Sequence, residues 1–122
     1  MSMDKLLTEV TESIEREYGR AGAKFGLTNH SDHESYAILL EEMDEAHDEF
    51  TNCHIQMEHF WDQVKGNQED YSKHHCLTRM YTYALYAACE MIQVAAMAKK
   101  AALTVAERGM VNELVGRGGE SQ

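Results

Sequence analysis

Carboxylates dominate one stretch of this sequence, and nothing nearby balances their charge. Residues 25–64 contain ten acidic side chains and no Lys or Arg. Glu45 lies three residues after Glu42 and four residues from both Glu41 and Glu49. Like charges at these spacings destabilise a helix by about 0.2–0.5 kcal/mol per pair. On a helix, Glu42, Glu45 and Glu49 fall on one flank of an apolar stripe. These carboxylates therefore form either a solvated acidic face or a site that collects cations.

A further carboxylate stands alone in an apolar segment. Glu90 is the only acid between residues 71 and 106, and the nearest Lys or Arg is nine positions away. An ionised carboxylate in such surroundings is costly unless it is paired or bound to a metal. A salt bridge from another helix, a protonated carboxyl hydrogen-bonded to Gln93, or a metal ion shared with Glu42 and Glu45 would each stabilise it. The shared metal explains both groups of acids together.

The donor types indicate which metal such a site prefers. Carboxylates at Glu42, Glu45, Glu49 and Glu90, with the amide of Gln93, form a hard-oxygen set that suits Mg²⁺, with Mn²⁺ as a substitute, better than zinc. Mg²⁺ commonly binds through carboxylates together with substrate phosphates. The pattern therefore points to chemistry on phosphoanhydrides.

Three helices are predicted to position these residues. The chain has no proline, is rich in helix-forming residues, and shows no convincing strand pattern, so the fold class is all-α. The first helix is expected at about residues 4–24. Ser31 and Glu34 form a capping-box pattern that begins a second helix, which ends near Val64 before the turn signal at residues 65–67. A third helix is expected at about residues 70–107.

The apolar faces of these helices predict how they pack. The second helix carries an apolar stripe expected to face the core, formed by Leu39, Met43, Ala46, Phe50, Cys53 and Met57. The third is apolar nearly all round and is therefore predicted to be buried. Three such helices seldom complete a core alone, so we expect a bundle of three to four helices completed by self-association into a homodimer or homotetramer. Residues 1–108 are expected to form one domain and residues 109–122 a flexible tail.

Charge and composition exclude several classes of partner. The formal net charge of −10 argues against nucleic-acid polymers and against anionic membrane surfaces. Residues 83–98 form the longest apolar stretch, which is interrupted by polar residues and short for a membrane span. The N-terminus lacks a signal-peptide pattern, and the three cysteines contain no CxxC pair. We therefore expect a cytoplasmic protein with reduced thiols.

Two segments resemble a known family. HESYAILLEEMDE (33–45) and EMIQVAAMA (90–98) are similar to the MazG-like all-α nucleoside triphosphate pyrophosphohydrolases, especially the short forms of phages and bacteria. The resemblance covers residues 20–49 and 83–102. It implies an ExxE on one helix and an ExxD on the next that bind Mg²⁺, and hydrolysis of a (deoxy)nucleoside triphosphate to the monophosphate and pyrophosphate. Glu42 and Glu45 match the ExxE, Glu90 matches the first acid of ExxD, and Gln93 stands where the family has Asp.

The same resemblance implies further roles and one alternative. Glu41 or Glu45 is expected to act as general base. Lys100 lies on the same side of its helix as Gln93 and Met97, so it either contacts a substrate phosphate or is an ordinary solvated lysine near the helix end. The neutral Gln93 and the unmatched residues 50–83 support a second hypothesis, a catalytically weakened relative that acts as a helical binding or assembly protein.

A third hypothesis is a helical module that binds zinc or iron. Cys53-His54 and His74-His75-Cys76 flank the predicted turn and could meet across it to bind zinc. A di-iron site would need two Glu-x-x-His pairs, and only Asp44-x-x-His47 comes near that pattern.

Overall fold

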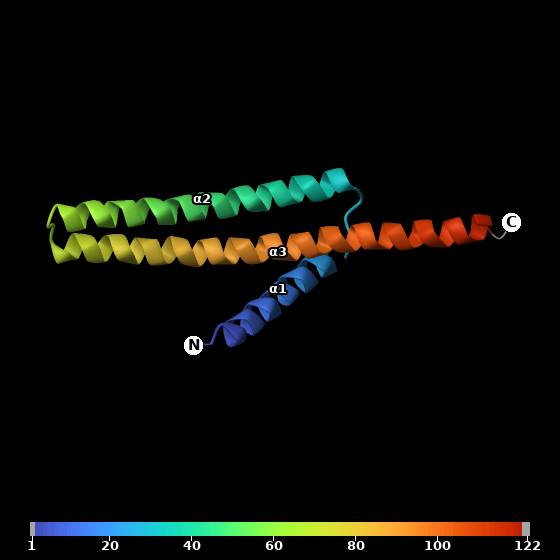
Figure 1. The fold of residues 1–122 in the computed structure, drawn as a ribbon, viewed down its shortest axis with the longest axis horizontal. Coiled ribbons are helices and arrows are strands. Elements are labelled where there is room, and N and C mark those ends of the chain that lie inside the picture. The colour runs from blue at the N-terminus through green and yellow to red at the C-terminus, as the bar shows by residue number, and fades with distance from the viewer. Residues whose placement is uncertain (1, 121–122) are drawn as a thin grey trace. The chain divides into compact units, whose positions relative to one another are not determined.

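The computed structural model describes the backbone of residues 2–120 and the side chains of residues 2–110. Three helices and no strand occur in this part of the chain, which confirms the all-α prediction: α1 (Met3–Phe25), α2 (Asp32–Lys65) and α3 (Asp70–Glu120) (Figure 1). None of the described helices has a stretch long and apolar enough to cross a membrane.

Local signals fix the helix ends near residues 26 and 31. α1 ends at Phe25 and is capped by Gly26, whose φ of 93° lies in the region that glycine adopts without strain. Ser31 Oγ accepts a hydrogen bond from the backbone N–H of Glu34 at 3.1 Å, as the capping pattern predicts. The Glu34 carboxylate pairs with His30 Nδ1 at 3.0 Å. It therefore contacts a side chain in place of the backbone N–H of Ser31, which the second bond of a capping box would use.

The turn between α2 and α3 lies where the sequence predicts it. α2 ends at Lys65, and Asn67 adopts a positive φ of 50°. α3 begins at Asp70 and continues past Gly109 to Glu120, so the predicted end near residue 107 is too early. A glycine inside a helix costs about 1 kcal/mol, which does not force an end to a helix of this length. The domain limits at residues 108 and 109, and the flexibility of the tail, stay predictions.

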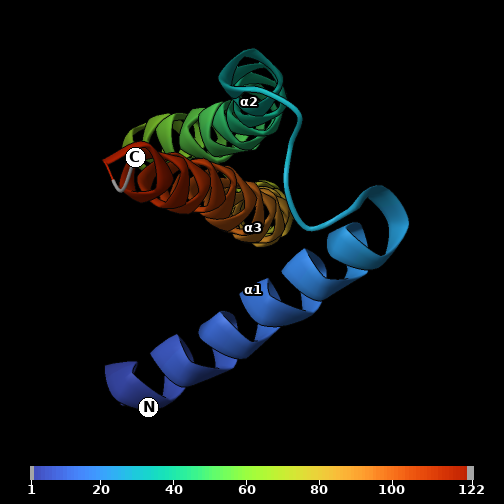
Figure 2. The same cartoon turned by 90° about the vertical axis from the view of Figure 1, so that its right-hand side faces the viewer.

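Contacts divide the chain into two compact units. Unit 2, Glu41–Met91, is a helical hairpin in which α2 and α3 run antiparallel and side by side (Figures 1 and 2). Among its described residues the buried apolar side chains are Ala46 and Cys76, each 3% exposed. Cys76 Sγ donates to the backbone carbonyl of Gln56 at 2.9 Å. The core of this hairpin is therefore thin.

Unit 1, Met1–Leu40 with Ile92–Gln122, contains α1, the start of α2 and the C-terminal part of α3. Among its described side chains, the buried apolar ones are Val94 and Ala96. Lys99 pairs with Glu15 and so ties α3 to α1.

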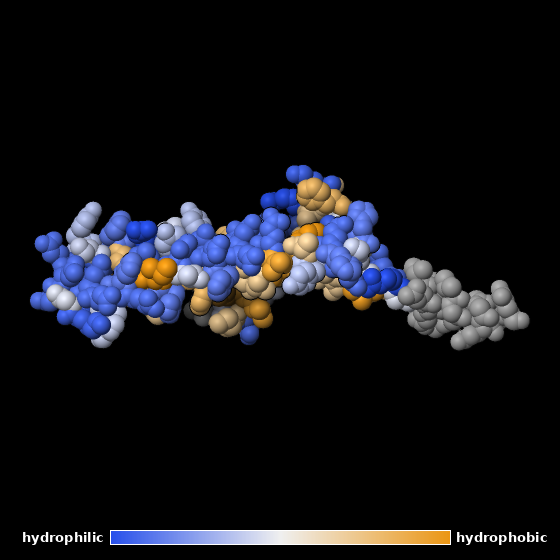
Figure 3. Space-filling model, turned by 90° about the horizontal axis from the view of Figure 1, so that it is seen from above, coloured by the Kyte–Doolittle hydropathy of each residue, from blue (hydrophilic) through white to orange (hydrophobic). Residues whose placement is uncertain are grey.

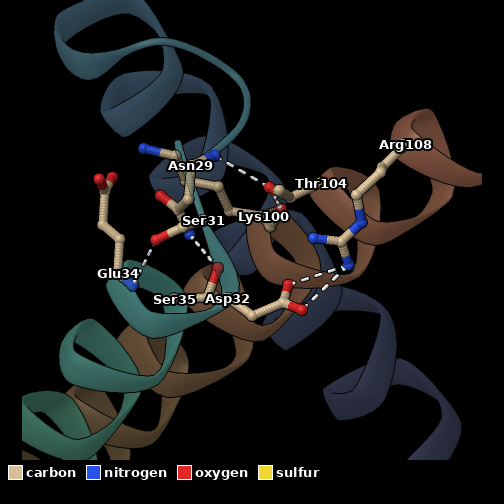
Figure 4. A network of polar contacts seen from close by, with 8 residues as sticks. All are labelled: Asn29, Ser31, Asp32, Glu34, Ser35, Lys100, Thr104 and Arg108. Atoms are coloured by element: carbon tan, nitrogen blue, oxygen red, sulfur yellow. Dashed lines mark hydrogen bonds and ion pairs between the residues drawn. The ribbon is translucent and has the colours of Figure 1, made fainter. Parts of the chain in front are cut away.

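A polar network secures the linker between α1 and α2 inside unit 1 (Figure 4). The backbone N–H of Asn29 donates to Thr104 Oγ1 at 2.9 Å, and Asn29 Nδ2 donates to Ser35 Oγ at 2.8 Å. Arg108 Nη2 donates to both carboxylate oxygens of Asp32, at 3.1 and 3.0 Å. These bonds hold residues 29–35 against α3.

Two predictions about burial are wrong. In the apolar stripe of α2 only Ala46 is buried, whereas Met43, Phe50 and Met57 are exposed. The predicted burial of the third helix also fails, because α3 exposes large apolar side chains such as Tyr81 (71%) and Met91 (50%). Each helix of unit 2 has only one helical neighbour there, which covers one of its faces. Apolar residues accordingly appear in patches on the surface (Figure 3), and the bundle of three to four helices and its oligomerisation stay predictions.

Candidate metal centre

Three carboxylates meet inside unit 2. Glu42 and Glu45 come from α2 and Glu90 from α3, and one oxygen of each lies within 4.8 Å of the others. The spacing of three residues places Glu42 and Glu45 on the same side of α2. Glu90 faces them from the antiparallel helix. No other group of three or more His, Cys, Asp or Glu residues in the described part of the chain is close enough to share a metal ion.

The cluster concentrates negative charge without a cationic partner. Among the residues that the structure describes, no Lys, Arg or His forms an ion pair with Glu42, Glu45 or Glu90. The salt bridge that could have explained Glu90 is therefore not found there.

The pKa values of the cluster reflect this crowding. Burial raises the pKa of Glu42, and the charges of Glu45, Glu90 and Glu41 raise it further. Burial likewise raises the pKa of Glu90, followed by the charge of Glu45, a hydrogen bond to Glu45 and the charge of Glu49. Glu42 and Glu90 are thus harder to ionise than ordinary glutamates, and a bound cation would reverse this effect.

Glu49 extends this oxygen-rich surface. Its Oε2 atom is buried without a hydrogen-bond partner. Glu42, Glu49, Gln56 and Gln63 recur every seven residues along α2, and Gln63 Oε1 is also buried and unpartnered. The row faces α3, because Gln56 accepts from Cys76 of α3 through both its backbone carbonyl and Oε1. Gln56 and Gln63 were not among the predicted site residues, although the seven-residue repeat of Glu and Gln was the signal for them.

The other predicted site residues have different surroundings. Glu41 is exposed, and its charge contributes to the raised pKa of Glu42. Gln93 belongs to unit 1, where Nε2 donates to Glu17 Oε2 at 3.0 Å. The alternative in which Gln93 bonds a protonated Glu90 is not what the structure shows, because the amide of Gln93 bonds α1 instead. The role of Gln93 as a ligand stays a prediction.

Lys100 also lies in unit 1, and it is not a solvated surface lysine. Its side chain is 5% exposed, and its backbone carbonyl accepts a hydrogen bond from Thr104 Oγ1 at 2.8 Å (Figure 4). The residue lies among the polar contacts that hold the linker between α1 and α2 (Figure 4). Its contact with a substrate phosphate stays a prediction.

The thiols do not assemble a zinc site among the described residues. Cys53 Sγ donates to the backbone carbonyl of Met80 at 3.6 Å, and Cys76 Sγ donates to that of Gln56. The histidines beside them do not form a cluster that could hold a metal ion within the side chains described. The oxygen ligands at Glu42, Glu45 and Glu90 are thus the metal-binding candidates that the structure brings together.

No protein family model, curated protein or solved structure matches this chain. The resemblance to the MazG-like pyrophosphohydrolases rests on the two sequence segments alone and remains a hypothesis.

Proposed function

We propose that this protein is a Mg²⁺-dependent nucleotide pyrophosphohydrolase that converts a (deoxy)nucleoside triphosphate to the monophosphate and pyrophosphate. The observation that supports it best is the convergence of Glu42, Glu45 and Glu90 within 4.8 Å, without an ion pair to a Lys or Arg among the described residues. The same three residues carry the resemblance to the ExxE and ExxD motifs.

The carboxylates present fit a hard divalent cation. Glu42, Glu45 and Glu90 would hold it, and Glu49 offers an oxygen without a hydrogen-bond partner. Mg²⁺, when bound, supplies positive charge beside phosphate oxygens and lowers the pKa of the attacking water. Mn²⁺ would substitute for it because it accepts the same oxygen ligands.

The chain itself provides the proton acceptor and part of the binding surface. Glu41 and Glu45 are exposed and can accept a proton from water, the role of a general base. Lys100 is outside this proposal, because its side chain is buried in unit 1. We also propose that the protein works as a homodimer or homotetramer, since a single chain leaves its apolar helix faces uncovered.

Pyrophosphate release from a panel of nucleoside triphosphates tests the proposal. We expect wild-type protein to release pyrophosphate only with Mg²⁺ or Mn²⁺, and Glu42→Gln to lose about 100-fold or more of the rate, as the removal of several kcal/mol of charge stabilisation implies. Glu12→Gln is the matched control, because Glu12 is exposed on α1 and lies outside the cluster. Equal rates for wild type and Glu42→Gln, or no release from any triphosphate, would contradict the proposal.

A second candidate function is a helical binding or assembly protein of the same descent. The neutral Gln93, bonded to Glu17, and the exposed apolar faces of α2 and α3 favour it. A chain that associates with itself but releases no pyrophosphate and is not stabilised by Mg²⁺ would support this candidate over the first.

A further inference from the structure

One side of α3 in unit 2 carries a small polar groove, which we call the tyrosine groove. Its volume is about 290 Å³, and its lining residues all lie on α3: Thr78, Arg79, Thr82, Tyr83 and Tyr86. Four of these side chains end in a hydroxyl and the fifth in a guanidinium, so the lining offers hydrogen-bond donors and contains no carboxylate. On a chain with a formal net charge of −10, this surface suits a ligand that presents acceptors.

Arg79 supplies the only full positive charge of the tyrosine groove. It is the only Lys or Arg between residues 74 and 98, and it forms no ion pair with any residue that the structure describes. Its Nη2 donates to the hydroxyl of Tyr83 at 3.2 Å, and its guanidinium carbon lies 5.9 Å from the centre of the Tyr83 ring. These contacts hold the guanidinium beside the ring. Arg79 can therefore donate to a ligand without first breaking a salt bridge.

The tyrosine groove lies in line with the candidate metal centre. Arg79, Tyr83 and Tyr86 precede Glu90 by eleven, seven and four residues. With 3.6 residues per turn, all three fall within about 40° of the direction of Glu90 around the helix. With a rise of 1.5 Å per residue, Tyr86 and Tyr83 lie about 6 and 10 Å from Glu90 along the axis. Met91, which borders a separate apolar groove of unit 2, lies about 100° away. The metal centre and the tyrosine groove therefore share one stripe of α3.

The size of the tyrosine groove indicates which part of a ligand it can hold. Complete small-molecule sites measure about 300–1,000 Å³, so a groove of about 290 Å³ has room for one ring system and not for a whole nucleotide. When the phosphates of a nucleotide lie at the metal centre, its sugar and base extend away from them. A base that extends along α3 reaches the ring of Tyr86, which is 51% exposed. Tyrosine rings and arginine planes are common stacking partners of unpaired bases.

We propose that the tyrosine groove is the base-binding subsite of this protein, in which the nucleobase stacks on Tyr86 and Arg79 donates to acceptors on the edge of the base. The inference rests on the proposed function, because it takes the phosphates to be held by a cation at the metal centre. It adds the residues that distinguish a nucleotide from a simple polyphosphate. Thr78, Arg79 and Thr82 lie among residues 50–83, which the family resemblance does not cover.

Isothermal titration calorimetry with two ligands and Mg²⁺ tests this subsite separately from catalysis. One ligand is a panel of nucleoside triphosphates with a methylene group between the α- and β-phosphorus atoms, which blocks the release of pyrophosphate. The other is methylenediphosphonate, which has no base. We expect Tyr86→Leu to raise the Kd of the best-bound nucleotide analogue about tenfold or more, because the stacking contact is lost, and to change the Kd of methylenediphosphonate less than about twofold. Tyr86→Phe keeps the ring and should bind both ligands within about twofold of wild type.

Three further variants complete the experiment. Tyr81→Leu is the matched control, because Tyr81 is 71% exposed on α3 but lies outside the tyrosine groove, and it should leave both Kd values unchanged. Glu42→Gln should raise the Kd of both ligands, because it weakens the metal centre that binds their phosphorus oxygens. Arg79→Met removes the charged donor and should raise the Kd of the nucleotide analogue about tenfold. Circular dichroism checks the fold of each variant, and Arg79→Met tests the subsite even if Tyr86→Leu fails to fold.

Three results would overturn the inference. Wild type could bind none of the nucleotide analogues. Folded Tyr86→Leu and Arg79→Met could bind them as tightly as wild type does, which would place the base elsewhere. Both variants could weaken the two ligands equally, which would mean that they disturb the metal centre and not a base. If the two variants behave as expected and wild type releases no pyrophosphate, the proposed hydrolysis fails and the subsite stands. If release depends on Glu42 and these variants bind like wild type, the inference alone fails.

Discussion

The variant Glu90→Gln distinguishes between two interpretations of the carboxylate cluster, a cation-binding site and an ordinary acidic surface. Without divalent metal, burial disfavours the charge of Glu90, and the charges of Glu45 and Glu49 disfavour it further. The amide of glutamine has nearly the same shape and no charge. We therefore expect the metal-free variant to be more stable than metal-free wild type, which is unusual for a substitution inside a helix-helix contact.

The geometry sets the size of this effect. The carboxylate oxygens lie within 4.8 Å of one another. At that upper limit two carboxylates repel by about 1 kcal/mol in water and by about 3.5 kcal/mol at an effective dielectric constant of about 20. Glu90 and Glu42 are half-buried and Glu45 is exposed, so the lower part of this range applies. We expect a gain of about 1–2 kcal/mol, which raises Tm by about 4–8 °C for a chain of this length.

Thermal and urea unfolding, each with and without Mg²⁺, measure both halves of the prediction. Wild type should gain about 1.4 kcal/mol when Mg²⁺ is present at ten times its Kd, whereas Glu90→Gln should gain far less because one of three ligands is lost. Glu12→Gln again serves as the control and should keep the full effect of Mg²⁺.

Two outcomes would refute the reasoning. A metal-free Glu90→Gln that is less stable than wild type would mean that the Glu90 carboxylate makes a favourable contact. An equal gain from Mg²⁺ in wild type and Glu90→Gln would mean that the cation acts elsewhere on this acidic chain.

Three smaller predictions follow from the same contacts. Because the pKa of Glu90 is raised in the folded chain, folding favours the protonated form of this carboxyl. The metal-free protein should therefore lose stability as the pH rises through and above the ordinary pKa of a glutamate. Urea titrations at several pH values measure this loss, and Glu90→Gln should make it smaller than in wild type. Thr104→Val leaves the backbone N–H of Asn29 unpaired and should lower the free energy of unfolding by about 1–3 kcal/mol, measured by urea denaturation. Ser31→Ala removes the cap on the Glu34 N–H and should cost about 1 kcal/mol in the same assay, whereas Ser31→Asp should restore most of it.

Local signals in the sequence predicted the elements well. The cap at Ser31 and the turn at residues 65–67 depend on neighbouring residues alone, and both occur where the sequence predicts them. The absence of proline likewise agrees with the long helices. The meeting of Glu42, Glu45 and Glu90 was also predictable, because an isolated acid in an apolar helix needs a partner and the acidic helix was the available one.

Burial could not be predicted in the same way. Periodicity shows which residues share a face, but it does not show whether that face meets a helix of the same chain or of another molecule. Met43, Phe50 and Met57 belong to the predicted apolar stripe and yet are exposed in the single chain. Gln93 shows a related limit, because its hydrogen bond is with Glu17 of α1, an element far away in the sequence.

Two neighbouring rows of residues on α2 show how the candidate metal centre is related to the exposed apolar face of this helix. Glu42, Glu49, Gln56 and Gln63 form the row next to α3, and each is followed directly by a member of an exposed apolar row, Met43, Phe50, Met57 and Val64. Adjacent residues differ by about 100° around a helix, so a rotation of that size would bury the apolar row instead.

Such a rotation would favour an isolated chain. Burying a side chain like Phe50 contributes about 1.5–3 kcal/mol, whereas a buried polar group without a partner costs about 1–3 kcal/mol. The observed orientation does the opposite, since it leaves Phe50 exposed and Glu49 Oε2 and Gln63 Oε1 buried without partners. A cation held near Glu49 would give its Oε2 a partner, and a second copy over the exposed apolar row would cover Phe50. We therefore expect that a dimer loaded with Mg²⁺ is more stable than either the metal-free dimer or the monomer.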